Sequence, residues 1–268
     1  MAVPSPTLPP ATTTNCWLLG ETDVIAVDPA GVTPRAQDGL QRTLEDAGLR
    51  VAAVLLTHHH GDHIGGARAL AASWEAPILA HPWTAAHVDL PIDRQVGDGE
   101  VLCTDVGVPW RLLHTPGHAP GHLCATDGAH VIAGDMVAGE GTIVLNPPEG
   151  DLAQYLSSLE ALKALAPDVL LPAHGPTITE AVSLLEDYIQ HRNARTEQVL
   201  AALRRAAGPR TARALVPDIY PDLPERFHGL AARQVLCHLL WLEDTHAALR
   251  DGGGWTCSPG PLATATRP

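Results

Sequence analysis

Short apolar runs separated by polar or glycine-rich turns dominate the chain up to Gly175. Apolar runs bounded by turn residues are typical of strands, and apolar positions three and four apart are typical of helices. The pattern predicts strands at 15–20, 24–28, 51–57, 77–80, 101–114 (as strand pairs), 123–126, 130–133 and 169–172. It predicts helices at 35–48, 67–74 and 152–165. An α/β (α+β) fold with two sheets and outer helices satisfies this order.

Helical periodicity takes over after Gly175. We expect helices at 179–205 (one long helix, or two with a break near Asn193), 211–219 and 229–249. These segments predict a small C-terminal helical domain, whereas the Gly-, Pro- and Thr-rich end of the chain predicts a flexible tail. The expected domains are therefore a catalytic domain at 1–190, the helical domain at 191–250 and the tail at 251–268.

Composition narrows the classes of function. The 268 residues carry 17 Lys and Arg against 30 Asp and Glu, a formal charge of −13, which disfavours binding to nucleic acid or an anionic membrane through bulk charge. No apolar run reaches the ~18 residues of a membrane span, and residues 1–14 lack the pattern of a signal peptide. Five cysteines without a C-x-x-C pair favour a reducing compartment, so we expect a cytoplasmic protein.

The segment 57–66 carries the strongest chemical signal, because it contains H-x-H-x-D-H directly after a predicted strand. His58 and His60 lie two residues apart and can face one cation, while His59 points away. A turn at Gly61 lets Asp62 and His63 face a second cation beside the first. Imidazole and carboxylate ligands suit zinc, and also manganese or iron. The alternative, a solvated His-rich loop, does not explain this spacing.

Three downstream residues lie at further predicted strand-to-loop junctions, where active sites gather. They are His118 between two Pro-Gly turns, Asp135 after the strand at 130–133, and His174 after the strand at 169–172. Taken singly, each is more often a surface, core or turn residue. Their occurrence together with the 57–66 motif predicts one dinuclear metal site.

These motifs resemble the metallo-β-lactamase superfamily, by motif from His58 to Gly175 and by element order over about 15–189. The resemblance implies an αββα sandwich with two divalent ions, zinc first, at one edge. It implies that His58, His60 and His118 hold one ion, that Asp62, His63 and His174 hold the other, and that Asp135 and a water bridge them. Asp62 would also orient the nucleophile and shuttle its proton, which makes it the expected catalytic residue.

The set of five His and two Asp is similar to the glyoxalase II and ribonuclease branch. Antibiotic-hydrolysing classes commonly have Cys in place of Asp135 or lack one His, so a dedicated antibiotic lactamase is not expected here, whereas weak side activity stays open. The segment 191–195, Tyr220 and the closing helix resemble the β-lactamase-like protein group, whose C-terminal domain is winged-helix-like. Animal members of that group are reported endoribonucleases, and fungal relatives release polyketides from carrier-protein thioesters.

Two further polar residues are candidate hydrogen-bond partners of the ligands. Asp28 ends a predicted strand and could orient a ligand His, or serve equally well as a turn former or helix cap. His122 lies four residues after His118 and could support the site or face the substrate, although a structural hydrogen bond within its loop is the stronger alternative. We expect His59 and His81 not to be ligands.

Three functions remain open. The first is hydrolysis of an ester, thioester or similar acyl substrate, a small molecule, by a metal-bridging hydroxide. The second is a single-strand endoribonuclease whose arginines could follow RNA phosphates: Arg192, Arg195, Arg204, Arg205, Arg210 and Arg213. The third is a non-catalytic metal- or partner-binding module. No membrane partner is expected, and the helical domain could cap the site, dimerise the chain or bind nucleic acid.

Overall fold

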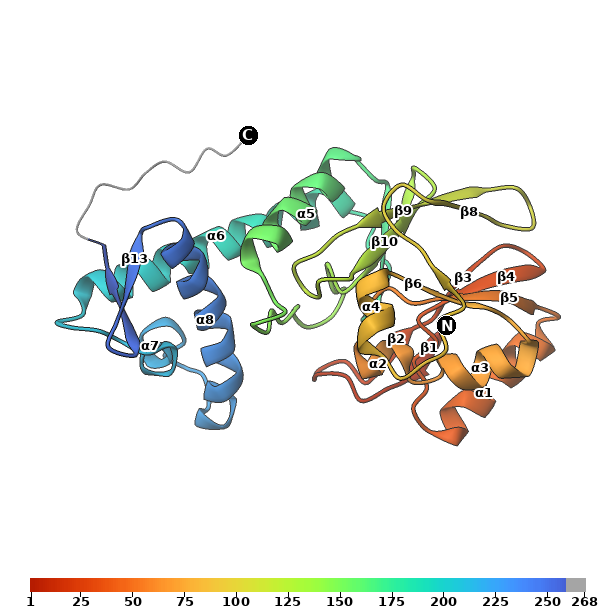
Figure 1. The fold of residues 1–268 in the computed structure, drawn as a ribbon, viewed down its shortest axis with the longest axis horizontal. Coiled ribbons are helices and arrows are strands. Elements are labelled where there is room, and N and C mark those ends of the chain that lie inside the picture. The colour runs from red at the N-terminus through yellow and green to blue at the C-terminus, as the bar shows by residue number, and fades with distance from the viewer. Residues whose placement is uncertain (259–268) are drawn as a thin grey trace.

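The computed structural model describes residues 1–258, and these form a four-layered αββα sandwich with a C-terminal domain beside it (Figure 1). Two five-stranded sheets lie face to face, and helices cover the outer face of each. The predicted fold class is therefore confirmed.

The first sheet has the strand order β3-β4-β5-β6-β7, with β3 antiparallel to β4 and the remaining pairs parallel. Its strands are β3 (Trp17–Leu19), β4 (Asp23–Val27), β5 (Arg50–Leu55), β6 (Ile78–Ala80) and β7 (Arg94–Gln95). The helices that follow these strands are α1 (Pro34–Asp46), α2 (Gly61–Ile64), α3 (Ala67–Trp74) and α4 (Pro82–His87). Thr33 caps α1, since its hydroxyl accepts a hydrogen bond from the amide of Ala36.

The second sheet has the order β12-β11-β10-β9-β8, in which only β11 and β12 are parallel among the described strand pairs. Its strands are β8 (Val101–Cys103), β9 (Pro109–His114), β10 (Leu123–Thr126), β11 (His130–Gly134) and β12 (Val169–Pro172). Helix α5 (Leu152–Ala164) and the first part of α6 (Ala181–Arg205) pack on its outer face. An additional ribbon, β1 (Ala2–Pro4) with β2 (Thr13–Asn15), comes from the segment that the sequence pattern left without structure.

Alternating side chains divide the sandwich into three apolar layers. In β4, Ile25 and Val27 enter the layer between the sheets, while Ala26 packs toward α1 and α3. In β11, Ile132 faces the first sheet, and its neighbours Val131 and Ala133 pack toward α5. Because both faces of each central strand are buried, the strands appear in the sequence as continuous apolar runs.

The C-terminal domain has its own apolar core, and α6 connects it to the sandwich as one continuous helix through Asn193 (Figure 1). Its elements after α6 are α7 (Ala212–Ile219), the 3-10 helix η1 (Glu225–Phe227), α8 (His228–Asp244), β13 (Ala248–Asp251) and β14 (Gly254–Cys257). The expected last helix is therefore too long at its end. The expected flexible tail is wrong over 251–257, because β13 and β14 pair as an antiparallel hairpin. The rest of that tail, 259–268, lies outside the described residues.

Candidate metal centre

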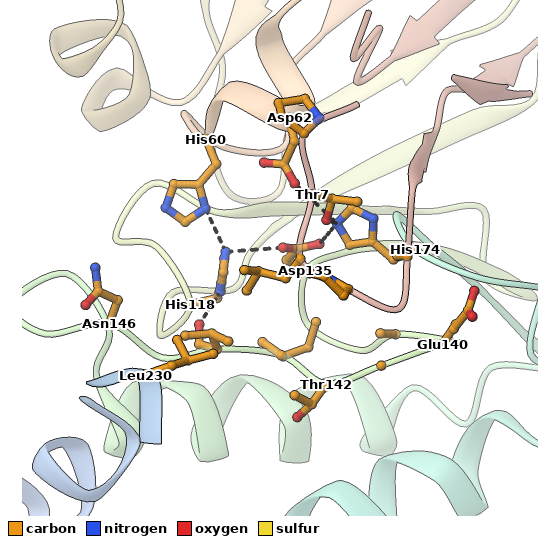
Figure 2. Close-up of a pocket in the computed structure, with 18 of the residues that line it drawn as sticks. Thr7, His60, Asp62, His118, Asp135, Glu140, Thr142, Asn146, His174 and Leu230 are labelled. Atoms are coloured by element: carbon orange, nitrogen blue, oxygen red, sulfur yellow. Dashed lines mark hydrogen bonds and ion pairs between the residues drawn. The ribbon is translucent and has the colours of Figure 1, made fainter. Parts of the chain in front are cut away.

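All seven predicted ligand side chains gather at one edge of the sandwich, where strands of both sheets end. Figure 2 shows His60, Asp62, His118, Asp135 and His174 among them. The segment after β5 carries the H-x-H-x-D-H motif into α2, and the β9–β10 loop carries His118. Asp135 follows β11 directly, and His174 lies two residues after β12. Residues that are far apart in the sequence therefore form one cluster, because these strands end at the same edge.

One group of ligand atoms comes from His58, His60, His118 and Asp135. The Nε2 atom of His118 lies 3.3 Å from Nε2 of His58 and 3.0 Å from Nδ1 of His60. The Asp135 Oδ2 atom lies 3.4 Å from the same His118 nitrogen. Four donors therefore surround one point.

A second group comes from Asp62, His63 and His174, and Asp135 adjoins it through its other oxygen. Asp135 Oδ1 lies 3.5 Å from His63 Nε2 and 3.4 Å from His174 Nε2. Asp62 Oδ2 lies 3.6 Å from His174 Nε2. The carboxylate of Asp135 thus stands between the two groups, with one oxygen toward each.

The hydrogen bonds of four imidazoles direct their Nε2 atoms into the cluster, whereas His60 faces it with Nδ1. Nδ1 donates to Asp28 in His63, to the Val144 carbonyl in His118 and to the Thr13 carbonyl in His174. Since the Thr57 hydroxyl donates to Asp28, Nδ1 of His58 donates to that hydroxyl. This arrangement fixes the tautomer that a metal requires, because the other ring nitrogen keeps its lone pair.

The donor set fits two divalent cations. Ligand atoms around a tetrahedral zinc ion with bonds of about 2.0–2.2 Å lie about 3.3–3.6 Å apart, which matches most of the separations above. Among the described residues, His63 Nε2 and Asp135 Oδ1 are buried polar atoms without a hydrogen-bond partner. Such orphaned atoms are costly unless a cation or water satisfies them.

Charge in the cluster follows from burial and from these neighbours. Burial, followed by repulsion from His63, lowers the pKa of His58 well below its ordinary value, so this imidazole is neutral. Burial alone would lower the pKa of His63 and raise that of Asp135. Their mutual attraction outweighs burial in both, with Asp28 assisting His63, so the pKa of His63 is raised and that of Asp135 is lowered. Without a metal, His63 therefore carries the proton that a cation would displace.

Asp28 lies directly behind the second group, as one of its two predicted roles requires. It is 2% exposed, and its Oδ2 accepts hydrogen bonds from His63 Nδ1 at 2.8 Å and from the Thr57 hydroxyl at 2.6 Å. Its Oδ1 accepts from the Thr57 amide, and its backbone has the left-handed φ of 53°. The side chain thereby ties the end of β4 to the start of the His motif.

His122 supports Asp135 rather than facing the cavity. Its Nε2 accepts a hydrogen bond from the backbone amide of Asp135 at 3.1 Å, and its Nδ1 donates to the Thr115 hydroxyl at 2.9 Å. Burial lowers the pKa of His122 well below its ordinary value, which keeps the ring neutral and able to accept. One hydrogen bond of His122 thus supports a candidate ligand, and the other ties the ring to its own loop.

The two histidines expected not to be ligands have other partners. His59 Nε2 pairs with Glu149 at 3.1 Å, and His60 lies at 4.0 Å from the same carboxylate, so these three side chains form a further, partly exposed group of potential ligands. His81 caps α4, since its Nδ1 accepts a hydrogen bond from the Trp83 amide, and its ring stacks on His114.

A cavity of about 540 Å³ opens above the cluster, and sequence reasoning missed most of its walls. The N-terminal segment contributes Thr7 and Leu8, and the hydroxyl of Thr7 lies 3.4 Å from His174 Nε2 (Figure 2). The C-terminal domain contributes Phe227, Leu230 and Arg233. No signal in the sequence marks these residues, because they come together only when the N-terminal segment and the C-terminal domain pack beside the site.

Three of the six arginines in the expected cluster have partners within the protein. Arg192 is 4% exposed and donates to the Ile143 carbonyl. Arg195 donates to the Ile219 carbonyl and lies over the Tyr220 ring, while Arg210 pairs with Asp218.

Within the described part of the chain, no helix is both long and apolar enough to cross a bilayer.

Comparisons with known proteins identify both parts of the fold. The family described as Metallo-beta-lactamase superfamily matches residues 9–174, and the Beta-lactamase associated winged helix domain matches residues 211–255. The chain is 30% identical to the Beta-lactamase-like protein 2 homolog of Drosophila melanogaster, over 86% of this chain and 82% of that protein. It is also 30% identical to the Atrochrysone carboxyl ACP thioesterase of Aspergillus chevalieri, over 79% of this chain and 69% of that protein.

Solved structures agree with these sequence matches. A metallo-beta-lactamase family protein from Thermus thermophilus superposes with a TM-score of 0.79 at 28% identity, covering 96% of this chain and 98% of that chain. Another structure, solved in a di-iron-bound form, superposes with a TM-score of 0.55 at 29% identity, covering 66% of this chain and 95% of that chain.

Proposed function

The chain belongs to the metallo-β-lactamase superfamily, and from this premise we propose that it is a dinuclear-metal hydrolase of thioesters or related acyl esters. The observation that carries the proposal is the Asp135 carboxylate, which stands between two groups of ligand atoms at the floor of a cavity. Zinc is the first candidate, and iron or manganese suits the same donors.

The chain's own side chains have separate tasks in such a reaction. Two divalent ions, when bound, supply Lewis acidity that lowers the pKa of water and polarises the substrate carbonyl. Asp62 lies at the cavity wall with its carboxylate 19% exposed, so it can both hold an ion and orient the attacking water. From there it can pass a proton to the leaving thiolate, which departs as the thiol. Asp28 and His122 keep His63 and Asp135 in place during turnover.

The cavity walls favour a substrate with an apolar acyl group. Leu8, Phe227 and Leu230 all line the cavity, although they are 51%, 41% and 38% exposed. Covering such side chains with an acyl group removes apolar surface from water, which contributes about 25 cal/mol per Å². Arg233 is the one guanidinium that lines the cavity among the described residues, and it suits an anionic end of the substrate. The name of the Aspergillus relative supports a thioester.

The proposal is tested by following thiol release from acyl-coenzyme A thioesters of several chain lengths, with zinc-loaded protein. We expect the wild type to turn over thioesters, and Asp62→Asn to lower kcat by at least about 100-fold, the usual contribution of acid–base catalysis. Asp38→Asn is the matched control, because Asp38 lies on the exposed face of α1 and should leave kcat unchanged.

End-labelled single-stranded RNA in the same assay distinguishes the alternatives. Cleavage of RNA that Asp62→Asn abolishes, without thioester turnover, would establish the ribonuclease instead. A protein that holds two metals per chain and turns over neither substrate would support the non-catalytic module and overturn the thioester proposal.

A further inference from the structure

The loop between β11 and α5 passes between the metal centre and the C-terminal domain. Its segment Ile143–Asn146 is bonded on one side to the domain helices and on the other side to a candidate ligand. Ile143 and Leu145 are buried, with 2% and 1% exposure, although they belong to no helix or strand. Backbone groups of a buried loop need partners as much as those of regular elements do.

Side chains of α6 and α8 supply these partners. The Gln234 side chain bonds both backbone groups of Leu145: its Oε1 accepts from the amide at 3.3 Å, and its Nε2 donates to the carbonyl at 2.8 Å. The buried guanidinium of Arg192 donates to the Ile143 carbonyl at 2.6 Å and to Gln234 Oε1 at 3.3 Å. Arg233 of α8 donates to the side chain of Asn146. Side chains of the C-terminal helices therefore satisfy the loop's backbone hydrogen-bonding groups and hold the loop in place.

Val144 lies between the two residues whose backbones are held in this way. Its carbonyl accepts the hydrogen bond from Nδ1 of His118 at 2.9 Å, which is the bond that leaves the His118 Nε2 lone pair free for a metal. Figure 2 shows His118 between this loop and the carboxylate of Asp135. A shift of the Val144 carbonyl would rotate His118 or leave its Nδ1–H unpaired.

We infer that Gln234 is a positioning residue for the metal centre: through Leu145 and Val144, the C-terminal domain fixes the direction of His118 Nε2. The inference rests on the metal centre of the proposed function, but it assigns the domain a task that is separate from lining the cavity. Partners that orient metal-bound histidines typically change metal affinity by about 10- to 100-fold.

Zinc binding to Gln234→Met tests this inference. Methionine keeps the length of the side chain but cannot bond the Leu145 backbone. We expect competition with a chromophoric chelator to show that one of the two zinc ions binds at least about tenfold more weakly, while the other keeps its wild-type affinity. Cobalt substitution should show an altered visible absorption spectrum, because the geometry at one ion changes.

Two controls separate positioning from folding. Gln198→Met changes the same residue type on an exposed turn of α6 and should leave zinc affinity unchanged. Leu215→Ala removes a fully buried side chain from the core of the C-terminal domain, so it should lower the melting temperature without weakening either zinc ion. Gln234→Glu keeps the acceptor toward the Leu145 amide but loses the donor, so it should weaken zinc less than Gln234→Met and serves if the methionine variant does not fold.

The outcomes are distinguishable. Wild-type affinity for both zinc ions in a folded Gln234→Met or Gln234→Glu protein would overturn the inference. Equal loss of zinc from Leu215→Ala would also overturn it, because the effect would then be one of stability. A wild type that binds no zinc would overturn the proposed function together with it, whereas two zinc ions without thioester turnover would leave the positioning role intact.

Discussion

For His58, His63, His118 and His174, the direction of the imidazole at the candidate metal centre depends on a single oxygen behind the ring. Of these oxygens, one belongs to the Asp28 carboxylate, one to the Thr57 hydroxyl, and two to the backbone carbonyls of Val144 and Thr13. Each oxygen selects the tautomer that leaves Nε2 free. The site is therefore as sensitive to the acceptors as to the ligands themselves.

Asp28→Asn is expected to weaken the second metal group without removing any ligand. The amide can still accept from Thr57, but its NH₂ group cannot accept from His63 Nδ1, so His63 loses its orienting partner. We expect about 10- to 100-fold weaker binding of one zinc ion in chelator competition. Asp23→Asn, which breaks an exposed ion pair with Arg50, should keep both affinities, and equal affinities in the two variants would argue against the role of Asp28.

Gly117→Ala is expected to destabilise the loop that carries His118. Gly117 has a φ of 130°, and an added Cβ would lie 2.2 Å from the backbone nitrogen of Tyr155. Because the atoms it would meet are backbone atoms of Tyr155, which cannot move aside as a flexible side chain could, we expect a loss of about 3–5 kcal/mol in the free energy of unfolding. Gly107→Ala is the matched control, since its φ is 76° but its Cβ would meet open space; it should cost only about 1 kcal/mol. Similar denaturant midpoints for the two variants would contradict this account.

The sequence could predict the residues of the candidate site but not all of their supports. His58 to His63 could be recognised because residue type and spacing together indicate metal chemistry. Asp28 could be recognised because it ends a predicted strand, and His122 because it lies four residues after His118. Val144 and Thr13 act through backbone carbonyls, which every residue possesses, so their identity carries no signal. Phe227 and Leu230 reach the cavity only through tertiary packing.

At the scale of elements, the longer strands and helices could be predicted because their apolar periodicity is set by burial on one or both faces. The short elements α4 and β7 were not predicted, since they are too short to show a period. The hairpin β13–β14 was missed because Gly-rich segments were interpreted as a tail, although Gly252 and Gly253, both with positive φ, are the residues that a tight hairpin turn needs. The β1–β2 ribbon was missed because proline and threonine dominate its segment, and its place against β12 is a tertiary contact.

The packing of α8 against α6 predicts an acid-sensitive element. His238 is 1% exposed and shares a hydrogen bond with the Thr196 hydroxyl. Burial, followed by the charges of Arg192 and Arg195, lowers the pKa of His238 to about 3. The unfolded state therefore binds a proton that the folded state excludes. Its contribution to stability is complete above about pH 6.5 and is lost as the pH falls from there toward 3.

Removal of this titrating group should flatten the pH dependence of stability. Between pH 7.5 and 5.5, His238→Gln should lose about 1.4 kcal/mol less of its free energy of unfolding than the wild type does, as measured by denaturant titration at both values. His246→Gln, at an exposed position of the same domain, should keep the wild-type slope. The same slope in all three proteins would show that His238 is not responsible.

At the scale of the whole molecule, both sheets, the N-terminal segment and the C-terminal domain all contribute groups to the candidate metal centre or its supports. The first sheet supplies the His motif, the second supplies His118, Asp135 and His174, and the N-terminal segment supplies the Thr13 carbonyl. The C-terminal domain reaches the same place through Gln234 and Leu145. Two cations there would join parts of the chain that are otherwise held by separate apolar cores.

Metal removal should therefore destabilise the sandwich as a unit. Free metal at about 1,000 times its dissociation constant stabilises the folded state by about 4 kcal/mol. For a chain of this size that corresponds to about 10 °C in melting temperature, at about 2–4 °C per kcal/mol. We expect calorimetry to show this decrease in melting temperature after chelation and its recovery when zinc is restored. The decrease on chelation should be smaller for Asp62→Asn, because that variant lacks one of the candidate ligands. Without metal, His63 Nε2 and Asp135 Oδ1 would again be buried atoms without a hydrogen-bond partner. A protein shown by elemental analysis to be metal-free that still melted at the metal-loaded temperature would therefore contradict the dinuclear site itself.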